Sequence, residues 1–243
     1  MPITSLIVAR SNMGMSQKPV IAGAELVAET LHLLQVHVVF SIVGIPVVEI
    51  TEACITGGIR FIAFRNKQSA SYPAQAYVYL TGRPGVCLVV GGPGVVYAMA
   101  GIVNAQVNCW PILVIAGYIE SYQREQSGFQ ELDHISFLKP HTKFSAQPPT
   151  VTHIPFMLEK AYRTAFYGRP GASFIDTPAN FIWASVASSP VNISSTDLSM
   201  PKCPKSMASA SMVSHVSSLL KLAKAPLVVI GKGWAYAQAE SHI

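Results

Sequence analysis

The stretch RPGVCLVVGGPGVVYAMAGIVNAQVNCWPILVIAG, residues 83–117, decides the fold class of this chain. It contains two short apolar runs, GVCLVV (85–90) and PILVIAG (111–117), which are separated by an alanine-rich helical pattern. Runs of this length that are bounded by Gly or Pro are typical of strands buried on both faces of a sheet. Two such strands joined by a helix predict a parallel β-α-β unit.

The same alternation continues on both sides of this unit. Three further apolar runs have the length and composition of buried strands, namely VHVVFSIV (36–43), IRFIAF (59–64) and GASFIDTP (171–178). Helical patterns accompany the strands, at residues 23–35, 47–55, 66–80, 94–106 and 154–167. The sequence therefore predicts an α/β domain with a mostly parallel sheet, flanked by helices and joined by right-handed crossovers.

Changes in composition along the chain predict its domain organisation. We predict a flexible tail over residues 1–19, the α/β domain over 20–183, and a linker rich in Ser, Pro and Lys over 184–207. Residues 208–243 restart the helix-strand pattern, with PLVVIG (226–231) as a strand. Because one helix and one strand cannot bury a core, we expect this start of a second α/β domain to be truncated relative to longer relatives.

The composition excludes several classes of protein. Half of the 243 residues are hydrophobic and 12% are charged, which is too apolar for a disordered chain and suggests surface that a partner covers. The net charge of +5 comes from scattered Lys and Arg without a basic run, so we expect no nucleic-acid partner. No uninterrupted apolar run reaches about 18 residues, so we expect no membrane span.

The cysteines and histidines do not indicate a metal site. The four cysteines lie far apart, without the Cys or Cys/His spacing of a zinc site, and we predict no metal ligands. Cys87 and Cys109 lie inside strand-like apolar runs and are predicted to be buried free thiols. His134 and His141 lie close to Glu131 in the sequence, and we expect both to be surface or interface imidazoles.

The turns after the predicted strands form the candidate site, because parallel α/β sheets bind ligands at the carboxyl ends of their strands. These turns are GIP (44–46), RNKQ (65–68), GGPG (91–94) and the long segment 117–133. GGPG does not complete a dinucleotide fingerprint, since Tyr97 occupies the third small position and no acidic residue follows at the next strand end. We therefore disfavour a nucleotide-dependent oxidoreductase and interpret the bare glycine backbone as a surface that a flat ligand approaches.

Taken together, these turns resemble the amino-terminal domain of 2-hydroxyacyl-CoA lyases, thiamine-diphosphate enzymes related to oxalyl-CoA decarboxylase and acetolactate synthase. The resemblance covers residues 20–183 and continues through IGKGWAYAQAE. Its segments are SIVGIPVVEI, FRNKQSA, RPGVCLVVGGPG, NAQVNCWPILVI, SGFQELD and YGRPGA. The resemblance implies a pyrimidine-binding domain that is followed by two further domains. It also implies a cofactor that lies between two subunits, so that a dimer is the minimum assembly.

The resemblance implies a role for ten residues of the turns and the following helices. Gly44, Ile45 and Pro46 match a loop near the reacting carbon, Gly92, Pro93 and Gly94 match the pyrimidine-side loop, Asn104 matches a position close to the cofactor, and Phe129, Gln130 and Glu131 match a loop that faces the neighbouring subunit's cofactor or substrate. Structural alternatives remain open for four of them. Gly44 and Gly94 suit tight turns, Asn104 suits a helix cap or an interface hydrogen bond, and Glu131 suits a solvated acidic turn.

Lys67 departs from the family pattern. The residue after Arg-Asn in the family is a glutamate, whose carboxylate favours the protonated pyrimidine ring and so activates the cofactor; an ammonium group disfavours that form. Loss of a buried charge-assisted hydrogen bond costs about 1.5–3 kcal/mol, which corresponds to roughly 10- to 100-fold in rate. Pro73 inside the predicted helix and Val78 in place of glycine suggest relaxed constraint here. The alternatives are an error in the sequence and a solvent-facing lysine on a first helical turn.

The resemblance implies cleavage of the C1–C2 bond of a 2-hydroxy fatty acyl-CoA to formyl-CoA and an aldehyde. It implies thiamine diphosphate with Mg²⁺, held by a GDG/GDS…N motif that these residues lack. We therefore expect a chain that is impaired or inactive alone, and leave open whether it is an enzyme. The alternatives are a non-catalytic partner that forms homo- or hetero-oligomers, and an acetolactate-synthase-like carboligase.

The compartment follows only from the resemblance. The family is often peroxisomal, and we expect an intracellular protein, with the cytoplasm and the mitochondrion as open alternatives. The carboxyl-terminal tripeptide Ser241-His242-Ile243 does not match a peroxisomal signal.

Overall fold

The computed structural model describes residues 20–188, 207–237 and 239. The predicted tail over 1–19, and the predicted linker from residue 189 to 206, lie outside the described residues. The first half of the domain comprises β1 (Val20–Ala22), α1 (Gly23–Leu33), β2 (Val38–Ser41), α2 (Val48–Thr56), β3 (Arg60–Ala63), α3 (Lys67–Thr81), β4 (Gly85–Val89) and α4 (Pro93–Asn108). The second half comprises β5 (Ile112–Tyr118), η3 (Ser121–Gln123), α5 (His134–Leu138), η4 (Lys139–His141), β6 (Phe144–Ala146), η5 (Val151–His153), α6 (Ile154–Phe166), β7 (Ala172–Pro178), α7 (Ala179–Trp183) and β8 (Ser185–Ala187).

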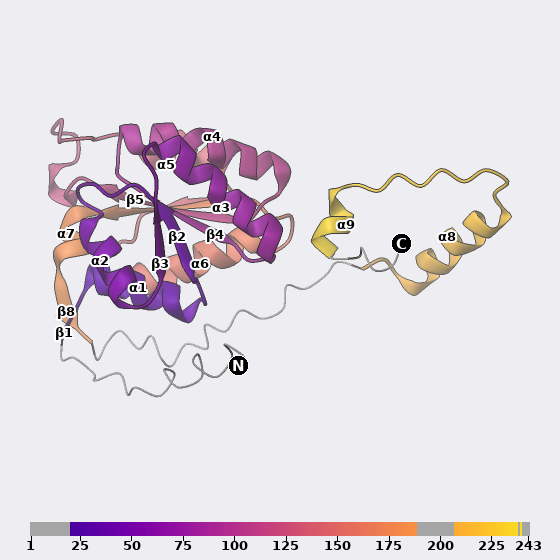
Figure 1. The fold of residues 1–243 in the computed structure, drawn as a ribbon, viewed down its shortest axis with the longest axis horizontal. Coiled ribbons are helices and arrows are strands. Elements are labelled where there is room, and N and C mark those ends of the chain that lie inside the picture. Colours follow the sequence, from indigo (N-terminus) through magenta and orange to yellow (C-terminus); the bar gives the residue numbers. More distant parts are fainter. Residues whose placement is uncertain (1–19, 189–206, 238, 240–243) are drawn as a thin grey trace, which may run out of the picture.

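The core of the domain is a six-stranded parallel sheet with the strand order β3-β2-β4-β5-β7-β6 (Figure 1). The five strands expected from the apolar runs are all present, and the bounds of each lie within two residues of the expected ones. The prediction of an α/β domain with a parallel sheet is therefore confirmed. The strand β6, which is only three residues long, adds a short edge that the apolar pattern did not reveal.

Helices cover both faces of the sheet (Figure 1). Their apolar side chains form two hydrophobic clusters with the strands. Helices α1, α2 and α6 pack on one face, and α3 and α4 pack on the other. Along β4, Val86 and Leu88 belong to the first cluster, whereas Cys87 and Val89 belong to the second. This alternation explains why the strand reads as a continuous apolar run, since neither face meets water.

Helices α3 and α4 approach their neighbours closely because small residues lie at the contacts. A Cβ atom on Gly101 of α4 would lie 2.2 Å from the hydroxyl oxygen of Ser71 on α3, and one on Gly85 would lie 2.0 Å from the carbonyl oxygen of Ala74. Helix α3 begins at the N-cap Asn66, whose side-chain oxygen accepts hydrogen bonds from the backbone N–H groups of the second and third helical residues. The helix continues through Pro73 to Thr81.

The short strands β1 and β8 pair antiparallel and form a separate two-stranded sheet. Residues 185–187 were predicted as part of the linker, whereas the structure places them in this sheet, so that part of the prediction is wrong. Strands of three residues are too short to show periodicity, and their pairing depends on residues far apart in the chain. The sheet brings the start of the domain beside its end.

The segment 207–237 contains the helices α8 (Ala210–Leu222) and α9 (Lys232–Ala237). The strand predicted at residues 226–231 is absent from this described segment, and Leu227 is 87% exposed there. A strand forms only where a neighbouring strand pairs with its backbone groups, and this segment has no such neighbour in the described part of the chain. No helix in the described residues has the length and apolar character that a membrane span requires.

Candidate functional site

The turns that follow the parallel strands meet at one edge of the sheet. The turn 44–46 follows β2, the turn 91–94 follows β4, and the long loop 119–133 follows β5. Their backbones are in close contact, since a Cβ atom on Gly117 would lie 2.6 Å from the ring of Pro46. The register of the sheet thus brings together segments that are up to 90 residues apart, as the sequence predicted.

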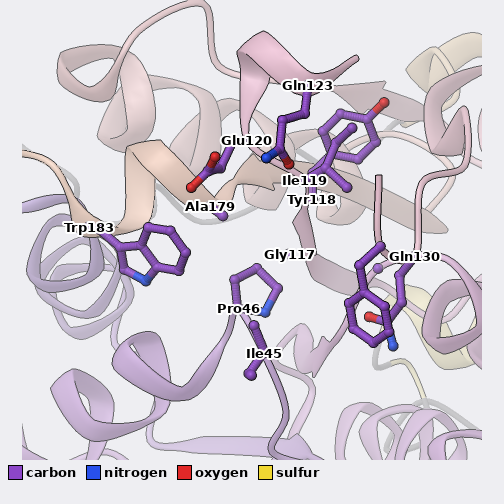
Figure 2. Close-up of a pocket in the computed structure, with 12 residues that line it drawn as sticks. Ile45, Pro46, Gly117, Tyr118, Ile119, Glu120, Gln123, Gln130, Ala179 and Trp183 are labelled. Atoms are coloured by element: carbon purple, nitrogen blue, oxygen red, sulfur yellow. The ribbon is translucent and has the colours of Figure 1, made fainter. Parts of the chain in front are cut away.

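A pocket of about 160 Å³ opens among these turns (Figure 2). Figure 2 shows the side chains of Pro46, Trp183 and Gln130 around the pocket, with the carboxylate of Glu120 at its upper side. Complete small-molecule sites usually enclose about 300–1,000 Å³, so this pocket is small for a whole site. The lining residues are Ile45, Pro46, Gly91, Gly117, Tyr118, Ile119, Glu120, Gln123, Phe129, Gln130, Ala179 and Trp183.

The glycines of the turn 91–94 leave no room for side chains. Gly92 has φ +51°, and a Cβ atom there would lie 2.6 Å from the carbonyl oxygen of Gln130. Cβ atoms on Gly44 and Gly94 would each lie 2.7 Å from a methyl group of Val90, which separates the two turns. The three glycines of the turn 91–94 are therefore buried in close packing, whereas Pro93 is exposed, and helix α4 begins inside the turn with Pro93 at its first position.

The loop 119–133 has a strained backbone that its own side chains hold in place. Glu125, Ser127 and Gln130 adopt positive φ angles, which non-glycine residues rarely do. The carboxylate of Glu131 accepts hydrogen bonds from the backbone N–H groups of Glu125 and Gly128, the latter at 3.0 Å. Gln130 therefore lines the pocket, while Glu131 stabilises the loop. The resemblance implies that both belong to a loop facing the neighbouring subunit's cofactor or substrate and that both are catalytic, whereas the structure gives their side chains different surroundings.

Lys67 is the first residue of α3 and is half-buried beside the glycine turn. Its Cε and Cδ atoms lie 3.3 and 3.4 Å from the position that a Cβ atom on Gly94 would occupy. The structure thus places Lys67 beside the turn 91–94. The amino ends of both α3 and α4 lie here, and neither helix carries an acidic residue in its first turn. Helix dipoles favour an anion at such a position, and Lys67 places a cation there.

Asn104 does not lie at this edge of the sheet. It is 12 residues along the chain from Gly92, which corresponds to about 18 Å along the helix axis. Its side-chain amide donates a hydrogen bond of 2.6 Å to Gln75 of α3 and accepts one of 2.8 Å from Asn108. In this structure Asn104 therefore joins α4 to α3 through hydrogen bonds.

A buried pair that the sequence did not reveal lies under the glycine turn. His134 was expected to be a surface or interface imidazole, but it is 1% exposed inside the domain, so that expectation is wrong. Its Nδ1 atom lies 3.0 Å from Oδ1 of Asp176, and its Nε2 atom accepts a hydrogen bond of 2.7 Å from the N–H of Gly92. The signal in the sequence was Asp176 itself, because a carboxylate inside a buried strand requires a partner.

Ionisation in this region follows burial. Burial raises the pKa of Asp176, and its hydrogen bond with His134 opposes that rise.

The cysteines Cys54, Cys87 and Cys109 are buried and are not joined in disulfides, as predicted for Cys87 and Cys109. Burial raises the pKa of Cys54 and of Cys87 to about 12, so both thiols remain protonated at neutral pH. Among the described residues, no group of three or more His, Cys, Asp or Glu side chains could hold a metal ion.

Comparison with known proteins supports the resemblance to thiamine-diphosphate enzymes. The family model described as "Thiamine pyrophosphate enzyme, N-terminal TPP binding domain" matches residues 21–137. The chain is 47% identical over 223 residues to 2-hydroxyacyl-CoA lyase 1 of Mus musculus, and this alignment covers 92% of the chain and 38% of the mouse protein. It is 45% identical over 236 residues to 2-hydroxyacyl-CoA lyase 1 of Homo sapiens, with 96% and 40% covered.

A more distant relative is oxalyl-CoA decarboxylase of Escherichia coli (strain K12), which is 33% identical over 228 residues, with 91% of this chain and 39% of that protein covered. The chain spans about two-fifths of the length of these curated relatives. The residues that the family model matches include the turns 44–46, 65–68 and 91–94 and the loop 119–133. Residues 21–137 therefore match the N-terminal binding domain of the thiamine pyrophosphate enzymes, and the chain is homologous to the corresponding part of 2-hydroxyacyl-CoA lyases.

Proposed function

We propose that this chain supplies the pyrimidine-side part of a thiamine-diphosphate site of the 2-hydroxyacyl-CoA lyase type, and that Lys67 makes this site poorly active. The single observation behind the proposal is the contact between the bare glycine turn 91–94 and the first residue of α3. In the related lyases, by resemblance, that first residue is the activating glutamate. Magnesium, peroxisomal location and an acyl-CoA substrate belong to the same proposal.

In this proposal the glycine turn accepts a flat ring system. Cβ atoms on Gly92 and Gly94 would lie 2.6 and 2.7 Å from atoms of Gln130 and Val90, so the two glycines allow the turn to pack closely against these residues. Lys67 does not fit the role of the activating carboxylate, because its charge has the wrong sign for stabilising a protonated pyrimidine. The proposal therefore attributes the poor activity to the charge at position 67.

Thiamine diphosphate, when bound, supplies the nucleophilic carbon that cleaves a bond next to a carbonyl or carbinol carbon. The residues of this chain bind and orient the reactants. Ile45, Pro46 and Trp183 form an apolar wall of the pocket, and Gln130 and Glu120 offer hydrogen-bonding groups beside it. These residues suit the uncharged part of a 2-hydroxyacyl thioester, because the carboxylate of Glu120 would repel its phosphates.

A thermal-shift titration with thiamine diphosphate and Mg²⁺ tests the proposal on the 243-residue chain. We expect Lys67→Glu to lower the concentration at half-maximal shift by roughly 10- to 100-fold relative to the wild type, because one charge-assisted hydrogen bond is restored. Lys160→Glu is the matched control, since it makes the same charge change on α6, on the opposite face of the sheet. It should leave the titration unchanged.

Equal and strong stabilisation of the wild type and Lys67→Glu would refute the electrostatic role of position 67. A shift with neither variant would refute cofactor binding by this chain alone. A lyase assay with a 2-hydroxyacyl-CoA gives a second readout of the same role. Cleavage by the wild type at the rate of Lys67→Glu would also contradict the proposal.

A second candidate function is a non-catalytic subunit that associates with a copy of itself or with a full-length relative. The observation that favours it is a set of exposed apolar side chains on the adjacent helices α3 and α4, namely Tyr72, Tyr79, Leu80, Val96, Tyr97 and Val107. Apolar surface of this kind is typical of protein interfaces. Native mass spectrometry of the chain, alone and mixed with a full-length lyase, tests the candidate; a monomer in both samples would exclude it.

A further inference from the structure

The buried pair His134–Asp176 connects three separate elements at the carboxyl edge of the sheet. Asp176 lies on β7, His134 is the first residue of α5, and Gly92 is the N-cap of α4. The distances are 3.0 Å between His134 Nδ1 and Asp176 Oδ1, and 2.7 Å between Gly92 N and His134 Nε2. All three residues are buried, so water does not compete for these hydrogen bonds.

These contacts determine the protonation state of the imidazole. A backbone N–H can only donate, so Nε2 of His134 must accept and must therefore carry no proton. The proton of the neutral ring then lies on Nδ1, which donates to the carboxylate of Asp176. Asp176 thus sets the tautomer of His134, and that tautomer allows the hydrogen bond from Gly92. Protonation of Nε2 would remove the acceptor.

The surroundings hold the ring in one orientation. The rings of Tyr118 and Phe174 pack edge-on against His134, with centroids at 5.4 and 6.0 Å. Gly91 also contacts the ring, because a Cβ atom there would lie 3.2 Å from Cε1 of His134. The imidazole therefore fits a defined space between β5, β7 and the glycine turn.

We infer that Asp176 and His134 form a positioning pair that holds the N–H of Gly92 and thereby sets the shape of the glycine turn 91–94. A well-packed apolar side chain would fill the same space without the cost of burying a carboxylate, so stability alone does not account for the pair. The statement that this turn faces a cofactor rests on the proposed function. The hydrogen bonds among Asp176, His134 and Gly92 do not depend on it.

The charges around the pair come from every element packed against it. Tyr118 on β5, Asp133, which precedes α5, and Arg124 of the long loop interact with it electrostatically, and Glu131 interacts with Tyr118. On the side of α3, the Cε and Cδ atoms of Lys67 lie beside Gly94 of the glycine turn. A pH-dependent change in the turn is therefore assigned to His134 only if it follows the titration of the His134 ring itself.

Nuclear magnetic resonance of the 243-residue chain, without cofactor, tests the inference directly. The ring ¹⁵N shifts of His134 should report a proton on Nδ1 and a bare Nε2 at neutral pH. The amide of Gly92 should be protected from hydrogen exchange, and its shift should change with the same pH midpoint as the His134 ring. A proton on Nε2, or an unprotected Gly92 amide, would overturn the inference without any variant being made.

Two variants separate positioning from a general loss of stability. Asp176→Asn can present its amide group to Nδ1, which moves the ring proton to Nε2; we expect Gly92 exchange to accelerate about 2- to 10-fold. His134→Gln retains an uncharged acceptor, so the pH dependence of the Gly92 amide should disappear. The amide of Val114 in β5 is the control, and equal acceleration there would reduce the pair to a purely structural role and contradict the inference.

Discussion

At the scale of single residues, Lys67 and His134 are the two side chains that lie against the glycine turn 91–94 with a positive charge and an imidazole ring, respectively. Lys67 lies at the amino ends of two helices, where a negative charge is favoured, and reaches the glycine turn with its aliphatic stem. His134 lies below the same turn and binds its backbone. The turn is therefore held from one side by a neutral imidazole and covered on the other by a cation.

Gly85 offers a prediction at this scale. A Cβ atom there would lie 2.0 Å from the carbonyl oxygen of Ala74 and 2.7 Å from its carbon, and backbone atoms cannot move away cheaply. We expect Gly85→Ala to lower the free energy of unfolding by about 2–3 kcal/mol, which corresponds to a fall in Tm of roughly 5–10 °C. Thermal denaturation followed by circular dichroism measures the change.

Gly168→Ala is the matched control for this substitution. Gly168 has φ +65° and no atom within 4 Å of a Cβ position, so only the backbone conformation opposes a side chain. The expected cost there is about 1 kcal/mol. If the two substitutions reduced the stability equally, close packing of α3 on β4 would not be the cause.

At the scale of elements, α3 combines a good start with an unfavourable interior. Asn66 caps the helix with hydrogen bonds of 2.8 and 3.3 Å, whereas Pro73 lies at its seventh position and lacks the N–H that would bond to residue 69. The helix is retained because its inner face packs into the core through Ala70, Ala74 and Val78. Tertiary packing therefore outweighs the local cost of the proline.

Replacement of Pro73 should stabilise the chain. We expect Pro73→Ala to raise the free energy of unfolding by about 1–3 kcal/mol, because a backbone hydrogen bond and helix propensity are both restored. Pro84→Ala is the control, since Pro84 lies in the loop before β4 and its loss should reduce stability by about 0.4–1 kcal/mol. Urea denaturation of the three proteins gives the comparison; no gain at position 73 would contradict the prediction.

At the scale of the whole molecule, the parallel sheet and the small β1–β8 sheet perform different tasks. The parallel sheet collects the turns of the candidate site at one edge (Figure 1). The β1–β8 pair connects residue 20 to residue 187 and so joins the two ends of the domain. Short pairs at the ends of a domain are where local unfolding usually begins.

The hydrogen-bond pattern of β1 and β8 allows a sharp test. Gly23 donates to Ala184 at 2.9 Å, so in the antiparallel alternation Val186 and Ile21 form the next hydrogen-bonded pair, whereas the N–H of Ala187 points away. Val186→Pro should therefore cost about 1–3 kcal/mol and lower Tm, and Ala187→Pro should cost much less. Melting curves of both variants measure this, and equal losses would mean that the pairing does not stabilise the domain.

The sequence by itself determined the parallel sheet, its helices and the position of the candidate site. Long apolar runs bounded by glycine and proline encode buried strands through local composition, and the carboxyl ends of parallel strands must share an edge. The turns 65–68 and 91–94 were predicted to share this edge for the same reason, and in the structure Lys67 lies beside Gly94.

Only the tertiary structure decided the partners of polar side chains and the pairing of short strands. Asn104 hydrogen-bonds with α3, Glu131 holds its own loop, and His134 is buried against Asp176, which lies 42 residues away in the sequence. A hydrogen bond depends on where two side chains arrive after the chain has packed, and no local pattern encodes that distance. Periodicity in the sequence reports burial, whereas the partner of a polar group is set by long-range packing.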